Sequence, residues 1–214
     1  MTSLIEWPSF RRPLVAILRG IRPEETAAII DALVEAGFEA IEIPLNSPEP
    51  FRSIETAARR APTGCLVGAG TVLSVDQVGR LADAGGRLMV SPNVDEGVIR
   101  AASERGMVTM PGVFTATEAL LAASTGASVL KFFPASVLGP SGINAIRAVL
   151  PKLCLHLTHP NMLDYRDQRR GVGLQPLAYL PQSVVGETGV MQPCGQPTDG
   201  AAHRRTDQNR RRED

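Results

Sequence analysis

The chain has 214 residues, balances 22 Lys and Arg against 22 Asp and Glu, and is 43% hydrophobic. This length and apolar content suffice for one sizeable core, and the zero formal net charge excludes an overall basic nucleic-acid binder. No apolar run approaches the roughly 20 residues that a membrane span needs. The apolar run at 13–18 is too short for a secretion signal. Three scattered cysteines, Cys65, Cys154 and Cys194, fit no disulfide framework, so we expect a reduced, cytoplasmic protein.

The texture of the sequence changes near residue 151. Up to that point short apolar runs alternate with helical patterns, whereas Pro, Gln and Arg interrupt the periodicity beyond it. The last stretch, 196–214, is polar and charged and offers almost nothing to bury, which predicts a disordered tail. We therefore expect one domain over residues 1–195, regular to about 151 and irregular after it, followed by the tail.

Strands and helices are expected to alternate through the regular part. The strands are predicted at 13–18, 40–43, 65–70, 87–91, 107–110 and 127–133. The helices that follow them are predicted at 24–37, 50–60, 74–84, 94–106, 115–126 and 140–150. Two of these helices start with the spacing of a capping box, Ser74 with Gln77 and Thr115 with Glu118.

This alternation predicts an α/β fold, because short strands that are apolar throughout are typical of a parallel sheet covered on both faces. An open doubly wound sheet and a (β/α)8 TIM-type barrel are the candidate architectures. Even unit lengths and the lack of a GxGxxG motif after the first strand favour the barrel. Closing it requires two further strands. The candidates, 153–157 and 171–174, are atypical, so the last two βα units are expected to be atypical or incomplete.

Two charged residues interrupt apolar strands. Lys131 lies within VLKFF and Glu42 within AIEIP, and the chain holds only one other lysine, Lys152. Burial disfavours an ammonium group, and the neutral amine is the nucleophile that forms a Schiff base with a ketone. A carboxylate beside such a lysine is suited to moving protons. The alternatives are a lysine that reaches from the strand end to solvent and a buried ion pair that only stabilises the barrel.

Other candidates lie where the strands end. Arg19 follows the first strand and is suited to holding a carboxylate with two hydrogen bonds, although a surface ion pair is an equal alternative. The stretch 68–71, Gly-Ala-Gly-Thr, offers close backbone approach and one hydroxyl, or only a tight turn. The histidines His156, His159 and His203 lack metal-site spacing, so neither a metal nor a cofactor is predicted.

Taken together, the motifs at the strand ends resemble the aldolases that cleave 2-keto-3-deoxy-6-phospho sugar acids. The resemblance covers about residues 13–151. The segments LRG and EIPLNSP are similar to the galactonate branch of that family, whereas the gluconate branch usually reads E-I-T-L-R-T from the glutamate. The motifs are VAILRG (15–20), EIPLNSP (42–48), VGAGTV (67–72), SPN (91–93), MPGVFTATEA (110–119) and LKFFPAS (130–136).

The resemblance implies a metal-independent class I aldolase on a (β/α)8 barrel, usually a trimer, acting on a small phosphorylated keto-deoxy sugar acid. By position, Lys131 matches the Schiff-base lysine and Glu42 the general acid and base of the family. In the galactonate branch the reaction is cleavage of 2-dehydro-3-deoxy-6-phosphogalactonate to pyruvate and D-glyceraldehyde 3-phosphate. The positions that match substrate-binding residues are Arg19 and Thr71 for the carboxylate end and Pro92 and Phe133 for the pocket wall.

The sequence departs from the family after residue 151. The family continues with a strand ending in Gly-Gly-Val and a later Gly-Ser turn, which hold the substrate phosphate, but this chain reads LCLHLTHPN (153–161) and GVGLQP (171–176). Such a change is what a reading-frame shift or true divergence produces. Two alternatives to the galactonate activity therefore stay open: a 2-dehydro-3-deoxy-6-phosphogluconate or 4-hydroxy-2-oxoglutarate aldolase, and a catalytically impaired barrel.

Overall fold

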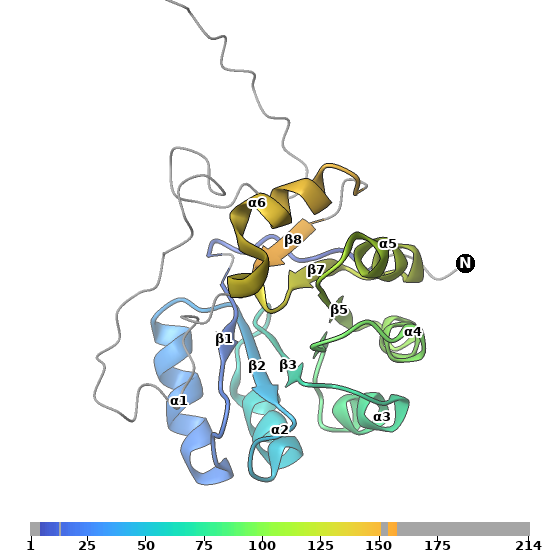
Figure 1. The fold of residues 1–214 in the computed structure, drawn as a ribbon. Coiled ribbons are helices and arrows are strands. Elements are labelled where there is room, and N and C mark those ends of the chain that lie inside the picture. Colours follow the sequence, from blue (N-terminus) through green and yellow to red (C-terminus); the bar gives the residue numbers. More distant parts are fainter. Residues whose placement is uncertain (1–4, 13, 151–153, 158–214) are drawn as a thin grey trace, which may run out of the picture.

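The computed structural model describes residues 5–12, 14–150 and 154–157. Parallel strands and helices alternate in it, as the sequence predicts (Figure 1). The candidate strand 171–174 and the tail 196–214 lie outside the described residues. The predicted end of the domain at residue 195 lies outside them too. The strands are β1 (Ala16–Ile17), β2 (Ala40–Pro44), β3 (Leu66–Gly70), β4 (Leu88–Val90), β5 (Val108–Met110), β6 (Gly112–Val113), β7 (Val129–Phe132) and β8 (Cys154–Leu157).

Helices follow the strands and lie on their outer side, as Figure 1 shows. The helix predicted at 50–60 has those bounds, and four others are shorter than predicted by one to four residues. The capping box of Thr115 and Glu118 is present, whereas Gln77 accepts from the N–H of Leu73 and not from that of Ser74. The helices are α1 (Pro23–Glu35), α2 (Pro50–Arg60), α3 (Val75–Asp83), α4 (Glu96–Glu104), α5 (Ala116–Thr125) and α6 (Ala135–Arg147).

Two elements differ from the prediction. After β5 and Pro111, the short strand β6 pairs with β7. The sequence did not predict β6, because a strand of two residues leaves no recognisable pattern. The helix predicted at 140–150 begins earlier, because α6 has a first turn before Gly139. The left-handed φ of 68° at Gly139 kinks the helix there, and Pro140 starts its second part.

The strands follow one another in chain order, β1 to β5 in one ladder and β6 to β8 in another. Backbone N–H groups of β7 and the residue before it join the two, since Ser128 donates to the carbonyl of Thr109 and Lys131 to that of Pro111. The side chains of Thr109 and Ser128 strengthen this junction, each accepting from the other's backbone N–H at 3.0 Å. A curved parallel sheet with helices outside is the arrangement of a TIM-type barrel, which confirms the predicted fold class.

Alternate residues of the strands enter two separate apolar clusters. The outer cluster lies between strands and helices and includes Ile41, Ile43, Leu130 and Phe132. The inner cluster is formed by Val15, Ala40, Leu66, Leu88, Val90, Val108, Met110 and Val129, with Ile5, Trp7 and Phe10 packed against it. Because successive side chains of a strand point to opposite faces, these two clusters identify the inner and outer faces of β2, β3, β4 and β7. Among the described residues, no helix is long and apolar enough to cross a membrane.

Candidate active site

Glu42 and Lys131 lie on the inner face of the sheet. Ala40 and Val129 belong to the inner cluster. Glu42 follows Ala40 by two residues in β2, and Lys131 follows Val129 by two residues in β7. With a period of two, the charged side chains therefore face the barrel interior, nearer the carboxyl ends of their strands. Both are buried, with exposed fractions of 1% for Glu42 and 8% for Lys131.

The Glu42 carboxylate is in an unusual electrostatic position. Its Oε2 is buried and has no hydrogen-bond partner among the described residues. Burial raises the pKa of Glu42 above its ordinary value, and the positive charges of Lys131 and Arg19 oppose that rise without cancelling it. A buried carboxyl group that the protein leaves partly unpaired is costly, and such groups are concentrated where a ligand or a proton is handled.

An aromatic ring lies beside Lys131, and a close backbone approach lies at its neighbour in β6. Its Nζ lies 5.3 Å from the centre of the Phe133 ring, within cation–π range, and Phe133 itself is 43% exposed. Lys131 is in register with Gly112 of β6. A Cβ atom at Gly112 would lie 2.4 Å from the carbonyl oxygen of Pro92, so the segment after β4 passes directly over β6. The Phe133 ring thus lies beside the amine, and the Pro92 carbonyl lies close to Gly112, the residue of β6 that is in register with Lys131.

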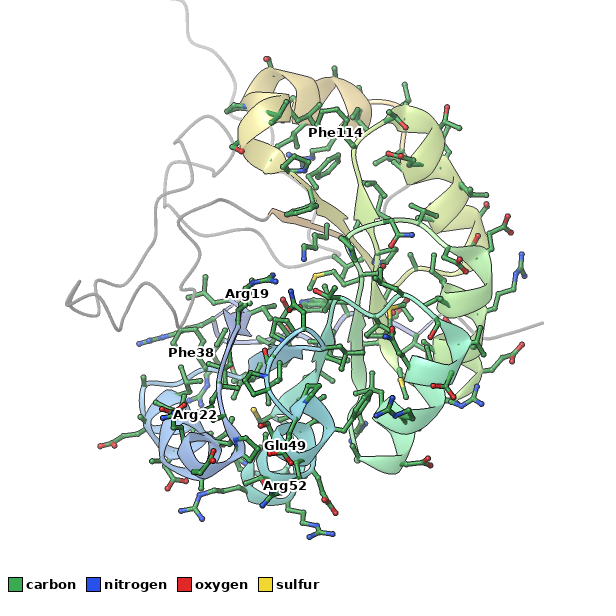
Figure 2. All side chains as sticks on the ribbon, turned by 60° about the horizontal axis from the view of Figure 1, so that its bottom comes forward. Arg19, Arg22, Phe38, Glu49, Arg52 and Phe114 are labelled. Carbon is green, nitrogen blue, oxygen red and sulfur yellow. The ribbon has the colours of Figure 1, made fainter. Side chains whose placement is uncertain are left out.

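Arg19 follows β1 and is held by the loop after β2. Its Nη1 donates to Oδ1 of Asn46 at 3.2 Å, and the next backbone N–H, that of Gly20, donates to Oγ of Ser47 at 2.9 Å. Figure 2 shows Arg19 nearer to the strands than Arg22 and Arg52, which lie over α1 and α2. Arg19 is close enough to stabilise the charged form of Glu42. The sequence predicted Arg19 as a residue at a strand end, but it did not show that Asn46 accepts a hydrogen bond from it.

Thr71 follows β3 in a strained conformation. Its φ of 58° is left-handed, which is a genuine outlier for a β-branched residue. Such strain costs on the order of 1–3 kcal/mol and is concentrated at functional sites. Thr71 directly follows Gly70, whose Cα borders the Glu42 carboxylate. Thr71 is therefore next along the chain to the glycine that approaches the buried acid Glu42.

The Gly-Ala-Gly stretch is not the tight turn that one interpretation of the sequence suggested. Gly68 and Gly70 are both within β3 and both buried. A Cβ atom at Gly68 would lie 1.9 Å from the carbonyl oxygen of Leu88, so the glycine permits β3 and β4 to approach. The sequence signal for this close approach was present, but only the strand register shows which groups approach.

A buried amine and a buried carboxyl group on the inner face, with an arginine and a hydroxyl after the two strands that flank β2, fit the chemistry of a Schiff base and its proton transfers. The part of the chain that the structure describes contains no group of three or more His, Cys, Asp or Glu side chains placed to hold a metal ion. The predicted site residues thus come together at one end of the strands, and their roles stay predictions.

Comparisons with known proteins agree with this arrangement. The family model for KDPG and KHG aldolases matches residues 9–154. The chain is 72% identical over 147 residues to the "Probable 2-dehydro-3-deoxy-6-phosphogalactonate aldolase" of Rhizobium meliloti (strain 1021). This match covers 69% of each of the two chains. It is 48% identical over 147 residues to the 2-dehydro-3-deoxy-6-phosphogalactonate aldolase of Escherichia coli (strain K12), covering 69% of this chain and 71% of that one.

A solved structure described as native KDPGal superposes with a TM-score of 0.68 at 47% identity, covering 70% of this chain and 73% of that chain. The resemblance stated from the sequence motifs is confirmed by these matches, and so is the TIM-type architecture. The match of the family model ends at residue 154, close to the change in sequence texture near residue 151. The family model covers well over half of the chain, which therefore belongs to the KDPG and KHG aldolase family.

Proposed function

We propose that this protein is a class I aldolase that cleaves 2-dehydro-3-deoxy-6-phosphogalactonate to pyruvate and D-glyceraldehyde 3-phosphate. The observation that carries the proposal is the placement of Lys131 and Glu42, both buried, on the inner face of the barrel. The choice of the galactonate substrate is supported by the names of relatives at 72% and 48% identity. Relatives named for the gluconate or 4-hydroxy-2-oxoglutarate reaction are 31% identical or less.

In the proposed mechanism, Nζ of Lys131 attacks the C2 ketone, and the carbonyl oxygen leaves as water to give an iminium ion. Glu42 takes the proton of the C4 hydroxyl, directly or through a water molecule, and D-glyceraldehyde 3-phosphate forms. The electron pair of the C3–C4 bond moves into the iminium, which becomes an enamine. Glu42 then helps to protonate C3 of the enamine. Hydrolysis of the resulting iminium releases pyruvate and restores the amine of Lys131.

The remaining residues have supporting roles in this proposal. Arg19, which Asn46 orients, holds the substrate carboxylate together with the hydroxyl of Thr71. Pro92 and Phe133 form the pocket wall near Lys131. Burial raises the pKa of Glu42, which suits a group that first takes a proton and later returns one. A general acid or base is most effective when its pKa lies near the working pH. No cofactor is needed for these steps.

The test of the proposal is borohydride reduction of the full-length protein in the presence of pyruvate, followed by mass spectrometry of peptides. We expect a stable pyruvyl adduct on Lys131, and loss of both the adduct and cleavage activity in Lys131→Ala. The second lysine, Lys152, is the internal control, because it does not match the Schiff-base position of the family. An adduct on Lys152 in place of Lys131 refutes the assignment.

A second experiment addresses the alternative of an impaired enzyme, which rests on the departure from the family after residue 151. The predicted pyruvate-binding groups Arg19, Thr71 and Lys131 are intact, whereas the glycine turns expected to hold the phosphate are missing from the sequence. We expect low solubility or weak activity and a blunted preference for the 6-phospho over the dephospho substrate, measured as the ratio of kcat/KM values. A strong phosphate preference together with a cooperative thermal transition shows that residues 152–214 complete the site.

The proposal extends to the state of the protein in the cell. The usual trimer of the family is expected if the barrel is complete, and sedimentation analysis measures it. The partner is the small phosphorylated sugar acid, with no nucleic acid or membrane involved. The odd, scattered cysteines support a cytoplasmic location.

A further inference from the structure

Gly70 borders the carboxylate of Glu42 more closely than any side chain would permit. It is the buried last residue of β3 and is in register with Pro44, two residues beyond Glu42 on β2. A Cβ atom built on Gly70 would lie 2.9 Å from Oε1, 3.0 Å from Cδ and 3.2 Å from Oε2 of Glu42. Contacts under 3.0 Å are ones that real Cβ atoms essentially never make. The volume that a side chain would fill is therefore occupied by the catalytic carboxylate.

The backbone of Gly70 does not itself require glycine. Its φ is not among the positive values of the chain, in contrast to Gly20 with 80° and Gly37 with 82°. An alanine at position 70 would therefore be acceptable to the backbone, and the obstacle is the carboxylate. Gly68 differs, because its Cβ would meet the backbone carbonyl of Leu88, which cannot move without disturbing β4. Gly68 thus permits the close approach of β3 and β4, whereas Gly70 leaves room for the Glu42 carboxylate.

Hydrogen bonding does not hold the carboxylate at Oε2, since that atom has no partner among the described residues. The carboxylate lies between β2 and β3 in the space where a side chain at position 70 would stand. We propose that Gly70 is a positioning residue for Glu42, and that its missing side chain leaves the space in which the carboxylate faces Lys131. This inference rests on the proposed function, because it assigns Gly70 to the proton transfers of Glu42.

The reaction that isolates this role is exchange of the methyl protons of pyruvate for deuterium. Nζ of Lys131 bonds to C2 of pyruvate and the carbonyl oxygen leaves as water, giving the iminium. The Glu42 carboxylate then takes a C3 proton, the C–H electron pair becomes the C=C bond of the enamine, and the C=N π pair returns to nitrogen. Glu42 exchanges that proton with solvent deuterium and returns a deuteron to C3. Pyruvate carries no phosphate, so this exchange does not depend on the turns after residue 151 that the family uses to hold the phosphate.

The key variant is Gly70→Ala, with Gly79→Ala in α3 as its matched control, because a Cβ at Gly79 would meet nothing within 4 Å. In the full chain, Gly70→Ala is expected to slow deuterium exchange by about 10–100-fold, the scale of a displacement of a catalytic group by roughly 1 Å. Borohydride labelling of Lys131, carried to completion, should persist. Gly79→Ala should exchange at the rate of the unchanged protein.

Glu42→Asp supplies the second arm, since its side chain is shorter by one methylene group and leaves room for the alanine methyl. In the Glu42→Asp background we expect Gly70→Ala to slow exchange by less than about threefold, a non-additivity that marks direct contact. Equal slowing in both backgrounds, or no slowing in either, overturns the proposal. If both proteins carrying Gly70→Ala fail to fold, the glycine serves the backbone as Gly68 does, and the proposal is also overturned.

The same data distinguish the two levels of inference. Absence of label on Lys131 in the unchanged protein refutes the proposed aldolase function, and the role of Gly70 with it. Label and exchange in the unchanged protein, together with normal exchange in Gly70→Ala, refute only the role of Gly70. Folding of the double variant where Gly70→Ala alone does not fold supports it, because the carboxylate is then the obstacle.

Discussion

The two ends of the barrel interior use alternate residues of the same strands and have opposite character. Toward the amino ends of the strands, Ala40 and Val129 join an apolar cluster against which Trp7 and Phe10 pack, their rings 5.6 Å apart and nearly perpendicular. Two residues further along the same strands stand Glu42 and Lys131, buried and charged. The first end is apolar, and the amino-terminal segment packs against it. The second contains a carboxylate oxygen that has no hydrogen-bond partner within the part of the chain that the structure describes.

Along one strand, an inward-facing apolar residue contributes to stability, and the inward-facing charged residue two positions later contributes to the proposed chemistry. Apolar burial stabilises the fold at about 25 cal/mol per Å² of surface removed from water. A buried carboxyl group with an unpaired oxygen opposes folding. The barrel supports such a group because the apolar layer beneath it and the outer cluster around it are extensive. Substitutions at the two ends should therefore have opposite effects on stability and on activity.

The largest effect is expected at the charged end. Glu42→Gln keeps the size of the side chain but removes its titratable proton, so cleavage of 2-dehydro-3-deoxy-6-phosphogalactonate should fall by about 10²–10⁴-fold. The measurement is steady-state turnover coupled to the appearance of pyruvate. Borohydride labelling of Lys131 serves as the control for an intact site. Unchanged turnover would mean that Glu42 has only a structural role.

The apolar end should respond in the opposite way. Leu88 is completely buried in the inner cluster, and Leu88→Ala should lower the free energy of unfolding by about 2–5 kcal/mol through lost burial and a cavity. Chemical denaturation of the full chain measures this change. At a temperature where the variant is still folded, labelling of Lys131 by pyruvate and borohydride should persist. Loss of labelling in a folded variant would show that the two ends are not separable.

The smallest effect concerns the pH dependence of stability. The folded-state pKa of Glu42 lies above its ordinary value, so the folded chain binds this proton more tightly than the unfolded chain. The resulting stability is fully present below the ordinary value of 4.5 and is lost as pH rises through the raised pKa of the folded state. Glu42→Gln should abolish this component and make the protein more stable at neutral pH, by on the order of 1 kcal/mol. Denaturation midpoints across pH measure it.

Glu118 provides a control of the opposite sign. The backbone N–H of Phe114 is the main cause that lowers the pKa of Glu118, with Thr115 adding to it and burial opposing it. The stability from Glu118 is present above its ordinary pKa and is lost as pH falls through its lowered, folded-state pKa. Glu118→Gln should therefore lower the free energy of unfolding at neutral pH and leave it unchanged at strongly acid pH. A matching pH response of the two variants would contradict the distinction between their environments.

The sequence by itself determined the alternation of strands and helices, the family and the two charged residues that interrupt apolar strands. Continuous apolar runs define buried parallel strands, and a lysine or glutamate inside such a run is conspicuous because its burial is costly. The capping box of Thr115 and Glu118 was also readable, since it depends on residues only three apart. These features are local in the chain, and local spacing is what a sequence displays directly.

Only the tertiary structure decided which groups meet. Strand β6 and the first turn of α6 were missed because two residues, or one turn before a kink, leave no periodic pattern. The packing of Gly70 against Glu42 and the hold of Asn46 on Arg19 join positions 28 and 27 residues apart. Period two assigns a side chain to a face, but the register between strands decides its neighbour on that face. That register is fixed by the packing of all the strands together, which no single segment encodes.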